Sequence, residues 1–350
     1  MIPIVIPSYE PDERFPAILE DLKQAGMGPV VVVDDGSGED YQDFFAKAEE
    51  LIKPLGGVVL HHEVNKGKGR GLKTAFSYIL ENMPDAVGCI TADSDGQHSV
   101  ECIRKCMDAL VEHPSNLILG VRDFSGENVP FKSRFGNTLT IRTCSFLCGV
   151  TVTDTQTGLR GIPSAFMKDL LDVAGERFEF ETRMLIATKD KYPIVEVPIK
   201  TIYDSKENHK THFNPVKDSI RIYKIFGAII LKYLFSSLSS FVIDIGLFQL
   251  FCIFFAGLPS YIIMATASSR ILSASYNYLI NHRLVFKSEK SHMSSLPKYA
   301  TLAFIQMGLS ALLVNGFFTL LPGAPELMYK IPIDICLFFL SYYVQRHFIY

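Results

Sequence analysis

The sequence predicts an α/β domain with a mostly parallel, doubly wound sheet, followed by an all-α domain of four transmembrane helices. Short Val- and Ile-rich runs alternate with amphipathic stretches over residues 1 to about 204, a pattern typical of successive βαβ units, and the first domain is expected at residues 1–212. Apolar residues then gather after about residue 225, in segments long enough to cross a bilayer. The chain has 350 residues, a length that suits two domains.

The expected strands of the first domain are short apolar runs. They cover residues 3–8, 30–34, 57–62, 86–92, 116–121 and 194–201. Helical patterns such as FPAILEDLKQAG and GLKTAFSYILEN lie between the early runs. Ligands of a doubly wound sheet bind beyond the carboxyl ends of its strands. The acidic turns PSYEPD, VDDGSGED and ADSDGQH follow three of the runs, and we expect a binding site there.

Charge and cysteine content exclude several classes of protein. The net charge of −3 does not mark a nucleic-acid binder, so we expect no nucleic-acid partner. The seven cysteines show no zinc-site spacing, which favours reduced thiols in the cytosol.

The first apolar run, MIPIVIPSYE, is too short for a signal peptide and has no basic start. We therefore expect the first domain to stay in the cytosol.

The second domain, expected at residues 229–350, carries four apolar segments of membrane-spanning length. They are expected at about residues 232–256, 260–284, 298–321 and 327–348. Before them, residues 213–228 predict an amphipathic helix that lies on the anionic membrane surface, or else an ordinary surface helix. Lys and Arg gather in the link between the second and third segments and are absent from the other two links. The positive-inside rule thus predicts a multi-pass protein of the cell membrane with both termini in the cytoplasm.

The membrane domain repeats itself in a parallel arrangement. KYLFSSLSSFVIDIGLFQLF resembles KYATLAFIQMGLSALLVNGFF, and SYNYLINHRLVF resembles FLSYYVQRHFIY. Three ionisable residues fall inside the expected spans, namely Asp244, Arg270 and Asp334. Because such residues are costly in a bilayer, we predict that Arg270 pairs with Asp244, Asp334 or both. The pairing either holds the bundle together or lies along a path for lipid headgroups.

Asp93 and Asp95 stand at the end of the fourth expected strand, in GCITADSDGQHSVE. Two carboxylates so spaced can share a divalent cation, and oxygen ligands favour Mg²⁺ or Mn²⁺. Gln97 adds a neutral oxygen to this set. Taken alone, the two acids fit a solvated turn equally well, but the acidic ends of the other strands favour a metal site.

The second and third strand ends carry further polar residues. VDDGSGED supplies Asp34 and Asp35, and carboxylates there can accept hydrogen bonds from a base or a ribose hydroxyl. The glycine-rich, basic stretch NKGKGRGLKTAF includes Lys68 but lacks the GK[ST] of a Walker A loop. It either approaches a diphosphate or is a flexible helix start.

Together these stretches resemble the family 2 glycosyltransferases, which have a GT-A nucleotide-sugar fold. IPSYEPD, VVDDGSGED, NKGKGRGLKTAF and TADSDGQH stand in that family's order and spacing, within residues 1–225. GVRDFSGENVPFKSRFGN, DTQTGLRGIP, FEFETRML and TIYDSKENHKTHFNPVKDSIRIY narrow the resemblance to enzymes similar to dolichyl-phosphate mannose synthase and bactoprenol glucosyltransferase. The second domain resembles GtrA-like membrane domains. At Ser94, Gly96 and Ser99 the metal stretch departs from the commoner DADLQHP form, which keeps the cation ligands but indicates a looser turn.

The resemblance and the strand-end chemistry together imply roles for individual residues. The metal ligands are expected to be Asp93, Asp95 and Gln97, and the catalytic residues Asp93, Asp95, Arg122 and Arg134. The residues expected around the nucleotide sugar are Pro7, Tyr9, Glu10, Asp34, Asp35, Lys68, Asp93 and Ser94. Those expected to bind the acceptor phosphate are Arg122, Ser133, Arg134 and Lys210, and those expected to line the cleft are Asp154, Gln156 and Arg160. Arginine suits a phosphate because its planar fork matches the phosphate oxygens.

The resemblance implies inverting, metal-dependent transfer of a hexose to a polyprenyl phosphate, undecaprenyl or dolichyl, at the cytoplasmic membrane face. The product would serve cell-envelope glycosylation. The expected donor is UDP-glucose, with GDP-mannose next, and the expected cofactor is Mg²⁺ or Mn²⁺. A phosphate acceptor is already an anion and needs no general base, so His98 is expected to be a packed or loop histidine. The loop KENHKTHF is expected to close on the diphosphate through Lys210 or His212, and a homo-oligomer is compatible with the sequence.

Other functions compete with this one. A processive polysaccharide synthase would carry a Q-x-x-R-W signature, and the chain has no Trp, although Gln156 and Arg160 keep part of the spacing. In another alternative the membrane half also acts as a flippase or transporter of the sugar lipid, supported by the three ionisable residues of its spans. A degenerate fold that only binds nucleotide sugars conflicts with the intact metal ligands.

Overall fold

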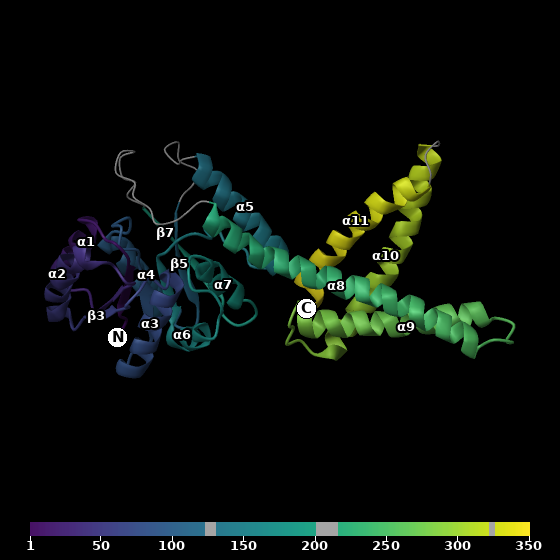
Figure 1. The fold of residues 1–350 in the computed structure, drawn as a ribbon, viewed down its shortest axis with the longest axis horizontal. Helices are drawn as coiled ribbons and strands as arrows, with labels where there is room; N and C mark the ends of the chain where they lie inside the picture. Colours follow the sequence, from purple (N-terminus) through teal and green to yellow (C-terminus); the bar gives the residue numbers. More distant parts are fainter. Residues whose placement is uncertain (123–130, 201–215, 322–325) are drawn as a thin grey trace. The chain divides into compact units, whose positions relative to one another are not determined.

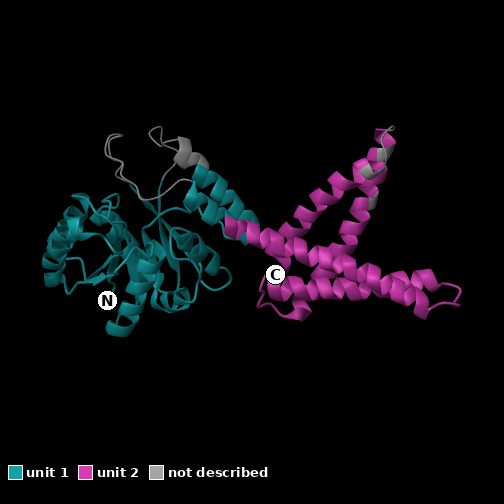
Figure 2. Cartoon of the chain, viewed as in Figure 1, with its two compact units in different colours: residues 1–223 teal, residues 224–350 magenta. Residues whose placement is uncertain are grey.

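Figure 1 shows the computed structural model of the chain, which describes residues 1–122, 131–200, 216–321 and 326–350. The chain forms two compact units, residues 1–223 and 224–350 (Figure 2). The first is an α/β domain and the second is helical, as the sequence predicts.

A seven-stranded sheet forms the centre of the first unit. Its strands are β1 (Ile4–Ser8), β2 (Val30–Asp34), β3 (Val58–His61), β4 (Gly88–Thr91), β5 (Leu117–Arg122), β6 (Arg160–Pro163) and β7 (Ile194–Ile199). Their order is β3-β2-β1-β4-β6-β5-β7, and every neighbouring pair is parallel except those made by β6. The mostly parallel sheet is therefore confirmed, whereas the short antiparallel strand β6 is absent from the expected set.

Helices cover both faces of this sheet (Figure 1). They are α1 (Arg14–Gln24), α2 (Gln42–Ile52), α3 (Lys68–Asn82), α4 (Val100–Glu112), α6 (Ser164–Leu171) and α7 (Glu179–Ala187). The first unit also contains α5 (Phe131–Cys148), which extends away from the sheet, and 3-10 turns at Glu39–Tyr41 and Lys53–Leu55. α1, α2 and α4 share one apolar core with the sheet, whereas α3 packs with α6 and α7. β1 and β2 are buried along their whole length, which explains their uninterrupted apolar sequences.

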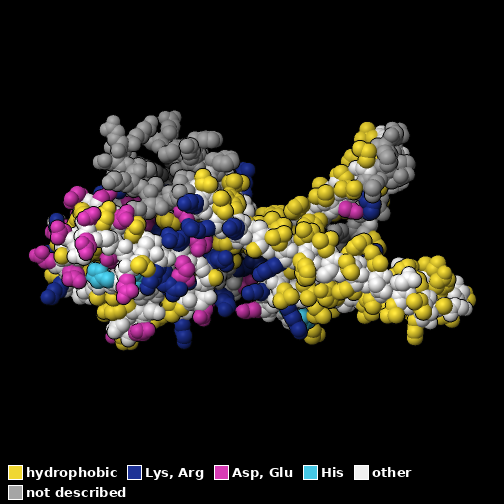
Figure 3. All heavy atoms as spheres, in the orientation of Figure 1, with side chains coloured by type: hydrophobic (Ala, Val, Ile, Leu, Met, Phe, Trp, Pro, Cys, Tyr) yellow, Lys and Arg dark blue, Asp and Glu magenta, His cyan; other side chains and the backbone are white. Residues whose placement is uncertain are grey.

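The long helix α8 (Lys217–Phe254) begins in the first unit and continues into the second, which also contains α9 (Tyr261–Ile280), α10 (His292–Leu320) and α11 (Glu326–Val344). α8 and the part of α10 over His292–Phe317 are long and apolar enough to cross a membrane. The expected amphipathic helix and first span form the single continuous helix α8, because Gly227 alone does not interrupt it. Figure 3 shows hydrophobic side chains over most of the visible face of this unit.

The internal repeat is visible in the helix ends of the second unit. α9 and α11 each continue into a π-helical segment, Asn281–Val285 and Gln345–Ile349, at equivalent positions of the repeat. The two segments touch through equivalent residues, since Asn281 Nδ2 donates to Gln345 Oε1 at 3.0 Å. The rings of Phe286 and Tyr350, also equivalent, stack with centroids 4.9 Å apart. The hairpins α8–α9 and α10–α11 are thus two copies of one unit that meet at this end.

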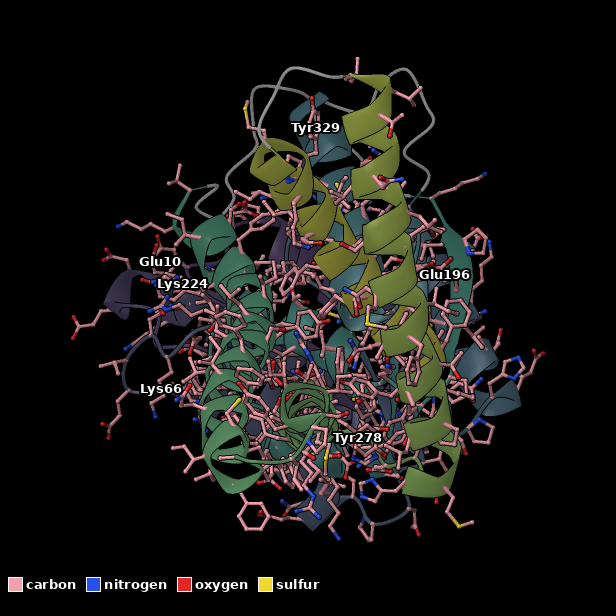
Figure 4. The ribbon with its side chains drawn as sticks, turned by 90° about the vertical axis from the view of Figure 1, so that its right-hand side faces the viewer. Glu10, Lys66, Glu196, Lys224, Tyr278 and Tyr329 are labelled. Carbon is pink, nitrogen blue, oxygen red and sulfur yellow. The ribbon has the colours of Figure 1, made fainter. Side chains whose placement is uncertain are left out.

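Aromatic rings surround that meeting point. Tyr278, labelled in Figure 4, lies with its ring centroid 5.4 Å from that of Tyr299 in the other hairpin. The equivalent pair, Tyr342 and Tyr233, has its centroids 4.9 Å apart. Each hairpin therefore packs the same two tyrosine positions against the other, which supports the pseudo-symmetry at the level of side chains.

Candidate active site

The carboxyl ends of β1, β2, β4 and β5 lie at one edge of the sheet because these strands are parallel or linked through β6. β6 runs in the opposite direction, so its first residue, Arg160, pairs with the last residue of β4, Thr91. The segment before β6, DTQTGL, is thereby brought to the same edge as the acidic turns. Thr91 Oγ1 donates to Gly158 O at 2.8 Å and ties the two segments together.

Asp93 is the centre of an ionic cluster at this edge. Lys68 Nζ lies 2.6 Å from Asp93 Oδ1 and 2.9 Å from Glu181 Oε1. His98 Nε2 lies 3.7 Å from Asp93 Oδ2. Burial acts to raise the pKa of Asp93, but the charge of Lys68 and hydrogen bonding with His98 hold that pKa well below its usual range. Asp93 is therefore an anion held by basic side chains.

The same cluster fixes the charge of Lys68. Burial acts to lower the pKa of its ammonium, and the carboxylates of Asp93 and Glu181 outweigh burial and raise it. Lys68 is the first residue of α3, and Gly67 before it has φ +101°, a conformation that favours glycine. A side chain at Gly67 would also overlap the backbone of Glu176, so this glycine allows the close approach that places Lys68.

Asp95 lies next to this cluster, but its pKa shifts in the opposite direction from that of Asp93. Burial and the charge of Asp93 raise the pKa of Asp95, although its Oδ1 accepts a hydrogen bond from the Gln97 backbone N–H at 3.1 Å. The described residues contain no cluster of three or more His, Cys, Asp or Glu side chains that would form a metal site. The set predicted here is two carboxylates and the Gln97 amide, all oxygen donors of the kind that Mg²⁺ and Mn²⁺ accept together with water. The unbalanced negative charge at Asp95 fits a cation.

Gly158 makes room for the Asp93 carboxylate. A Cβ at this position would stand 2.6 Å from Asp93 Cγ and closer still to its oxygen Oδ2. The DTQTGL segment and the metal turn therefore pack against each other with no space for a methyl group. Gly158 is a residue of the site that the sequence analysis does not single out.

Asp35 and Asp34 organise the second strand end. Asp35 is buried and accepts hydrogen bonds from the backbone N–H groups of Lys66 (3.0 Å) and Gly67 (2.7 Å), with His62 Nδ1 2.8 Å from its Oδ1. Asp34 accepts from Ser37 N at 2.9 Å. In this structure Asp35 thus anchors the loop that presents Lys68, in addition to the nucleotide role expected for it.

The first strand end adjoins this loop. Pro7 is a buried residue of β1, and Glu10 has φ +46° and donates its backbone N–H to Ser37 Oγ at 2.9 Å. Hydrogen bonding with Glu10 and partial burial raise the pKa of Tyr9. Ser94 is half-buried in the metal turn. The structure therefore brings the expected nucleotide residues to one edge of the sheet, on neighbouring strand ends.

Arg122 is held by a buried carboxylate. Its Nε lies 2.7 Å from Asp154 Oδ2 and its Nη2 3.0 Å from Asp154 Oδ1, a bidentate pair. Asp154 is fully buried and also accepts from Gln156 N at 2.9 Å. Two of the three expected cleft residues, Asp154 and Gln156, thus act together to set the orientation of Arg122.

Arg160 is buried rather than open to a ligand. It donates Nε to Thr157 O at 2.9 Å and Nη1 to Glu181 O at 2.8 Å. Burial lowers the pKa of Arg160, although the nearby negative charges of Glu181, Asp154 and Asp93 act to raise it. Its Nη2 lacks a hydrogen-bond partner within the described structure. Arg160 therefore braces the DTQTGL segment and helix α7 behind the ionic cluster.

Several expected residues are not described in full. Lys210 and His212 lie outside the described residues. Ser133 and Arg134 belong to α5, but their side chains are outside the description. His98 is buried, which agrees with the expectation of a packed histidine, yet it contacts Asp93.

Glu181 is a site residue that the sequence analysis missed. It lies in FEFETRML, a stretch used there only for its resemblance, and no local spacing connects it with Lys68. Glu181 lies in the first turn of α7, where an acid is favoured by the helix dipole whether or not it has a partner. The pairing with Lys68 is visible only in the folded chain.

The ionisable residues of the second unit form separate pairs. Arg270 Nε lies 3.4 Å from Asp244 Oδ2, and Asp334 Oδ2 lies 2.9 Å from Lys330 Nζ. Asp244 also accepts from Ser273 Oγ at 2.9 Å. Of the partners considered for Arg270, the structure thus places Asp244 beside it and engages Asp334 with a lysine of its own helix.

Comparison with known proteins agrees with this architecture. The family description "Glycosyl transferase family 2" matches residues 4–171, and "GtrA/DPMS, transmembrane domain" matches residues 232–350. An uncharacterized protein of Methanocaldococcus jannaschii is 31% identical over 205 residues, covering 57% of this chain and 81% of that protein.

Two further relatives have functional names. The UDP-N-acetylglucosamine–dolichyl-phosphate N-acetylglucosaminyltransferase of Methanococcus voltae is 30% identical over 223 residues, covering 58% of this chain and 86% of that protein. The dolichyl-phosphate hexose transferase of Haloferax volcanii is 28% identical over 198 residues, with 56% and 80% covered. The sheet topology and these similarities agree, and the chain belongs to glycosyltransferase family 2, with a GtrA/DPMS transmembrane domain as its C-terminal unit.

Proposed function

We propose that this enzyme transfers a hexose from a nucleotide sugar to a polyprenyl phosphate at the cytoplasmic face of the cell membrane, with inversion at the anomeric carbon. The observation that carries the proposal is the ionic edge of Asp93, Asp95 and Lys68 in a chain that also has a transmembrane domain. The names of the relatives from Methanococcus voltae and Haloferax volcanii, both dolichyl-phosphate sugar transferases, support the lipid-phosphate acceptor.

On the donor side, Asp93, Asp95 and Gln97 would hold Mg²⁺ or Mn²⁺. Such a cation, when bound, neutralises charge on the departing nucleoside diphosphate. Lys68 adds a fixed positive charge at the same edge, since its carboxylate partners keep it protonated. The turns after β1 and β2, with Tyr9, would receive the base and ribose. Among donors we favour UDP-glucose, with GDP-mannose next.

On the acceptor side, Arg122 is the described residue best suited to a phosphate. Its guanidinium is always charged, and Asp154 fixes its orientation through two hydrogen bonds. Ser133, Arg134 and Lys210 remain proposed partners in the same role. A phosphate acceptor is already an anion, so the reaction requires alignment and charge screening rather than a base. The contact of His98 with Asp93 suits a positioning role instead.

We further propose that the catalytic unit and both termini are cytoplasmic. The Lys and Arg residues that link α9 to α10 would then lie on the inner side, with the short links on the outer side. The first turns of α8, which carry Lys217, Arg221 and Lys224, would lie near the anionic inner leaflet.

A direct assay tests the proposal. Membranes that contain the full-length chain are incubated with undecaprenyl or dolichyl phosphate, Mn²⁺, and labelled UDP-glucose, UDP-N-acetylglucosamine or GDP-mannose. We expect an acid-labile labelled lipid from one of these donors and none from membranes with the D95A variant, which should remain membrane-bound. Absence of a labelled lipid with every donor would refute the proposal.

A further inference from the structure

The hairpin α8–α9 exposes a cation among many exposed apolar side chains. The Arg270 side chain is 72% exposed and pairs with Asp244 through Nε at 3.4 Å. Asp244 itself is mostly buried between the two helices and is also bonded to Ser273. The outer part of the guanidinium therefore points away from its own hairpin.

The hairpin α10–α11 exposes an anion at the equivalent place. The Asp334 side chain is 46% exposed, with Lys330 one turn away along the same helix and Ser310 donating to it at 2.8 Å. Asp334 and Arg270 occupy the same position of the internal repeat, because each lies eleven residues before the π-helical segment that ends its helix. One sequence position thus carries opposite charges in the two copies of the repeat.

Depth limits the groups that can reach these side chains. Eleven helical residues correspond to about 16 Å, roughly half the thickness of a bilayer's hydrocarbon core. With both π-helical segments at the inner membrane surface, Arg270 and Asp334 would lie at one level near the middle of the membrane, far from the lipid phosphates at its surfaces. Asp244 and Lys330 each partner one side of these charges, and the part that stays exposed would face hydrocarbon, which is costly unless a further protein partner covers it.

We propose that a second copy of this chain covers both faces, with Arg270 of one copy paired to Asp334 of the other. The hairpin α8–α9 of each chain would pack on the hairpin α10–α11 of its partner. Such an isologous contact forms the Arg–Asp pair twice around one two-fold axis. Both copies have the same orientation in the membrane, so residues at equal depth can meet. Exposed apolar side chains beside the pair, among them Ala267 and Ile331, would form the rest of the contact.

Charge exchange between differently tagged chains tests this pairing. R270D alone should set carboxylates against carboxylates, and D334R alone should set guanidinium groups against each other. Each variant should then co-purify with itself at least about tenfold less than the wild-type chains do, because opposed like charges destabilise the contact. Co-expression of R270D with D334R should restore co-purification, since every contact between the two different chains is again of opposite sign.

The outcome separates a pair between chains from other arrangements. If the co-expressed variants co-purify no better than each variant with itself, the proposal is wrong. If the double variant R270D/D334R recovers the thermal stability that each single variant loses, while differently tagged copies of it do not co-purify, the pair lies within one chain and the proposal is also overturned. Neither result depends on sugar transfer, so the proposed activity is tested separately.

Cross-linking provides a second measurement that leaves all charges in place. Chains with Cys252 and Cys336 replaced by serine carry A267C under one tag and I331C under another, one turn from Arg270 and Asp334 on the same helix faces. We expect a bis-maleimide to join the two tags. The matched control is F241C with M307C, equivalent exposed positions on α8 and α10. Equal or stronger cross-linking of the control pair, or none of A267C with I331C, contradicts the proposed surface.

Discussion

The ammonium of Lys68 lies 2.6 Å from the carboxylate of Asp93, one of the proposed ligands of the cation. An oxygen that binds this ammonium is less available to a divalent ion. Glu181, 2.9 Å from the same ammonium, offers it a second place to bind. The geometry thus describes a competition, in which Lys68 neutralises Asp93 until a cation does so and can then remain with Glu181.

The first prediction concerns Lys68 itself. K68Q should bind Mn²⁺ more tightly than the wild-type chain in the absence of donor, by about tenfold, because the competing charge is removed. Electron paramagnetic resonance of free Mn²⁺ measures this affinity. K66Q is the matched control, since Lys66 is exposed two residues away and should leave the affinity unchanged. Weaker Mn²⁺ binding by K68Q than by K66Q would show that Lys68 does not compete.

The second prediction concerns Glu181. E181Q should weaken Mn²⁺ binding several-fold, because Lys68 then has Asp93 as its one remaining carboxylate partner in the cluster. The double variant K68Q/E181Q should bind Mn²⁺ as K68Q does, since the effect of Glu181 passes through Lys68. This non-additivity is the decisive readout of the binding titrations. If the two substitutions act independently, Glu181 has no part in positioning Lys68.

The sequence predicts the parallel part of the sheet well because most of those strands are dense apolar runs. β2, for example, is VVVVD, and its observed bounds equal the expected ones. The sequence does not predict β6 because RGIP is short and shows no alternation of apolar and polar residues. Its Gly161 and Pro163 are also disfavoured in strands. Only the antiparallel pairing with β4 and β5 makes this segment a strand.

The site residues likewise fall into those that local sequence places and those that only the folded chain brings together. Asp93 and Asp95 follow a strand directly, so their place at the sheet edge could be read from local sequence. The pairs Lys68–Glu181 and Arg122–Asp154 join segments far apart in the chain, and no local pattern encodes which acid meets which base. The same holds for Arg160, which is expected to line the cleft: its burial and its hydrogen bonds to Thr157 O and Glu181 O are visible only in the folded chain.

The third prediction tests the support of Arg122. D154N should lower sugar transfer about 100-fold and raise the KM for lipid phosphate, because the guanidinium loses its bidentate partner and its orientation. R122K should act similarly, since lysine keeps the charge without the fork. The double variant should be no worse than either alone.

Transfer assays with varied lipid phosphate measure these effects, and thermal unfolding shows how much is due to the loss of a buried carboxylate. R142K, at an exposed arginine of α5, is the control and should be neutral. A D154N enzyme with unchanged acceptor KM would argue against Arg122 as a phosphate ligand.

The fourth prediction uses the close packing of Gly158 on Asp93. G158A would place a methyl group 2.6 Å from Asp93 Cγ, so the carboxylate or the DTQTGL segment must move. We expect sugar transfer to fall about 100-fold and Mn²⁺ binding to weaken, because charge stabilisation depends on the placement of Asp93. The control is G136A, whose methyl group would meet no other atom within 4 Å and should raise helix stability slightly. If G158A keeps full activity and full Mn²⁺ binding, the reaction does not depend on this exact placement of the Asp93 carboxylate.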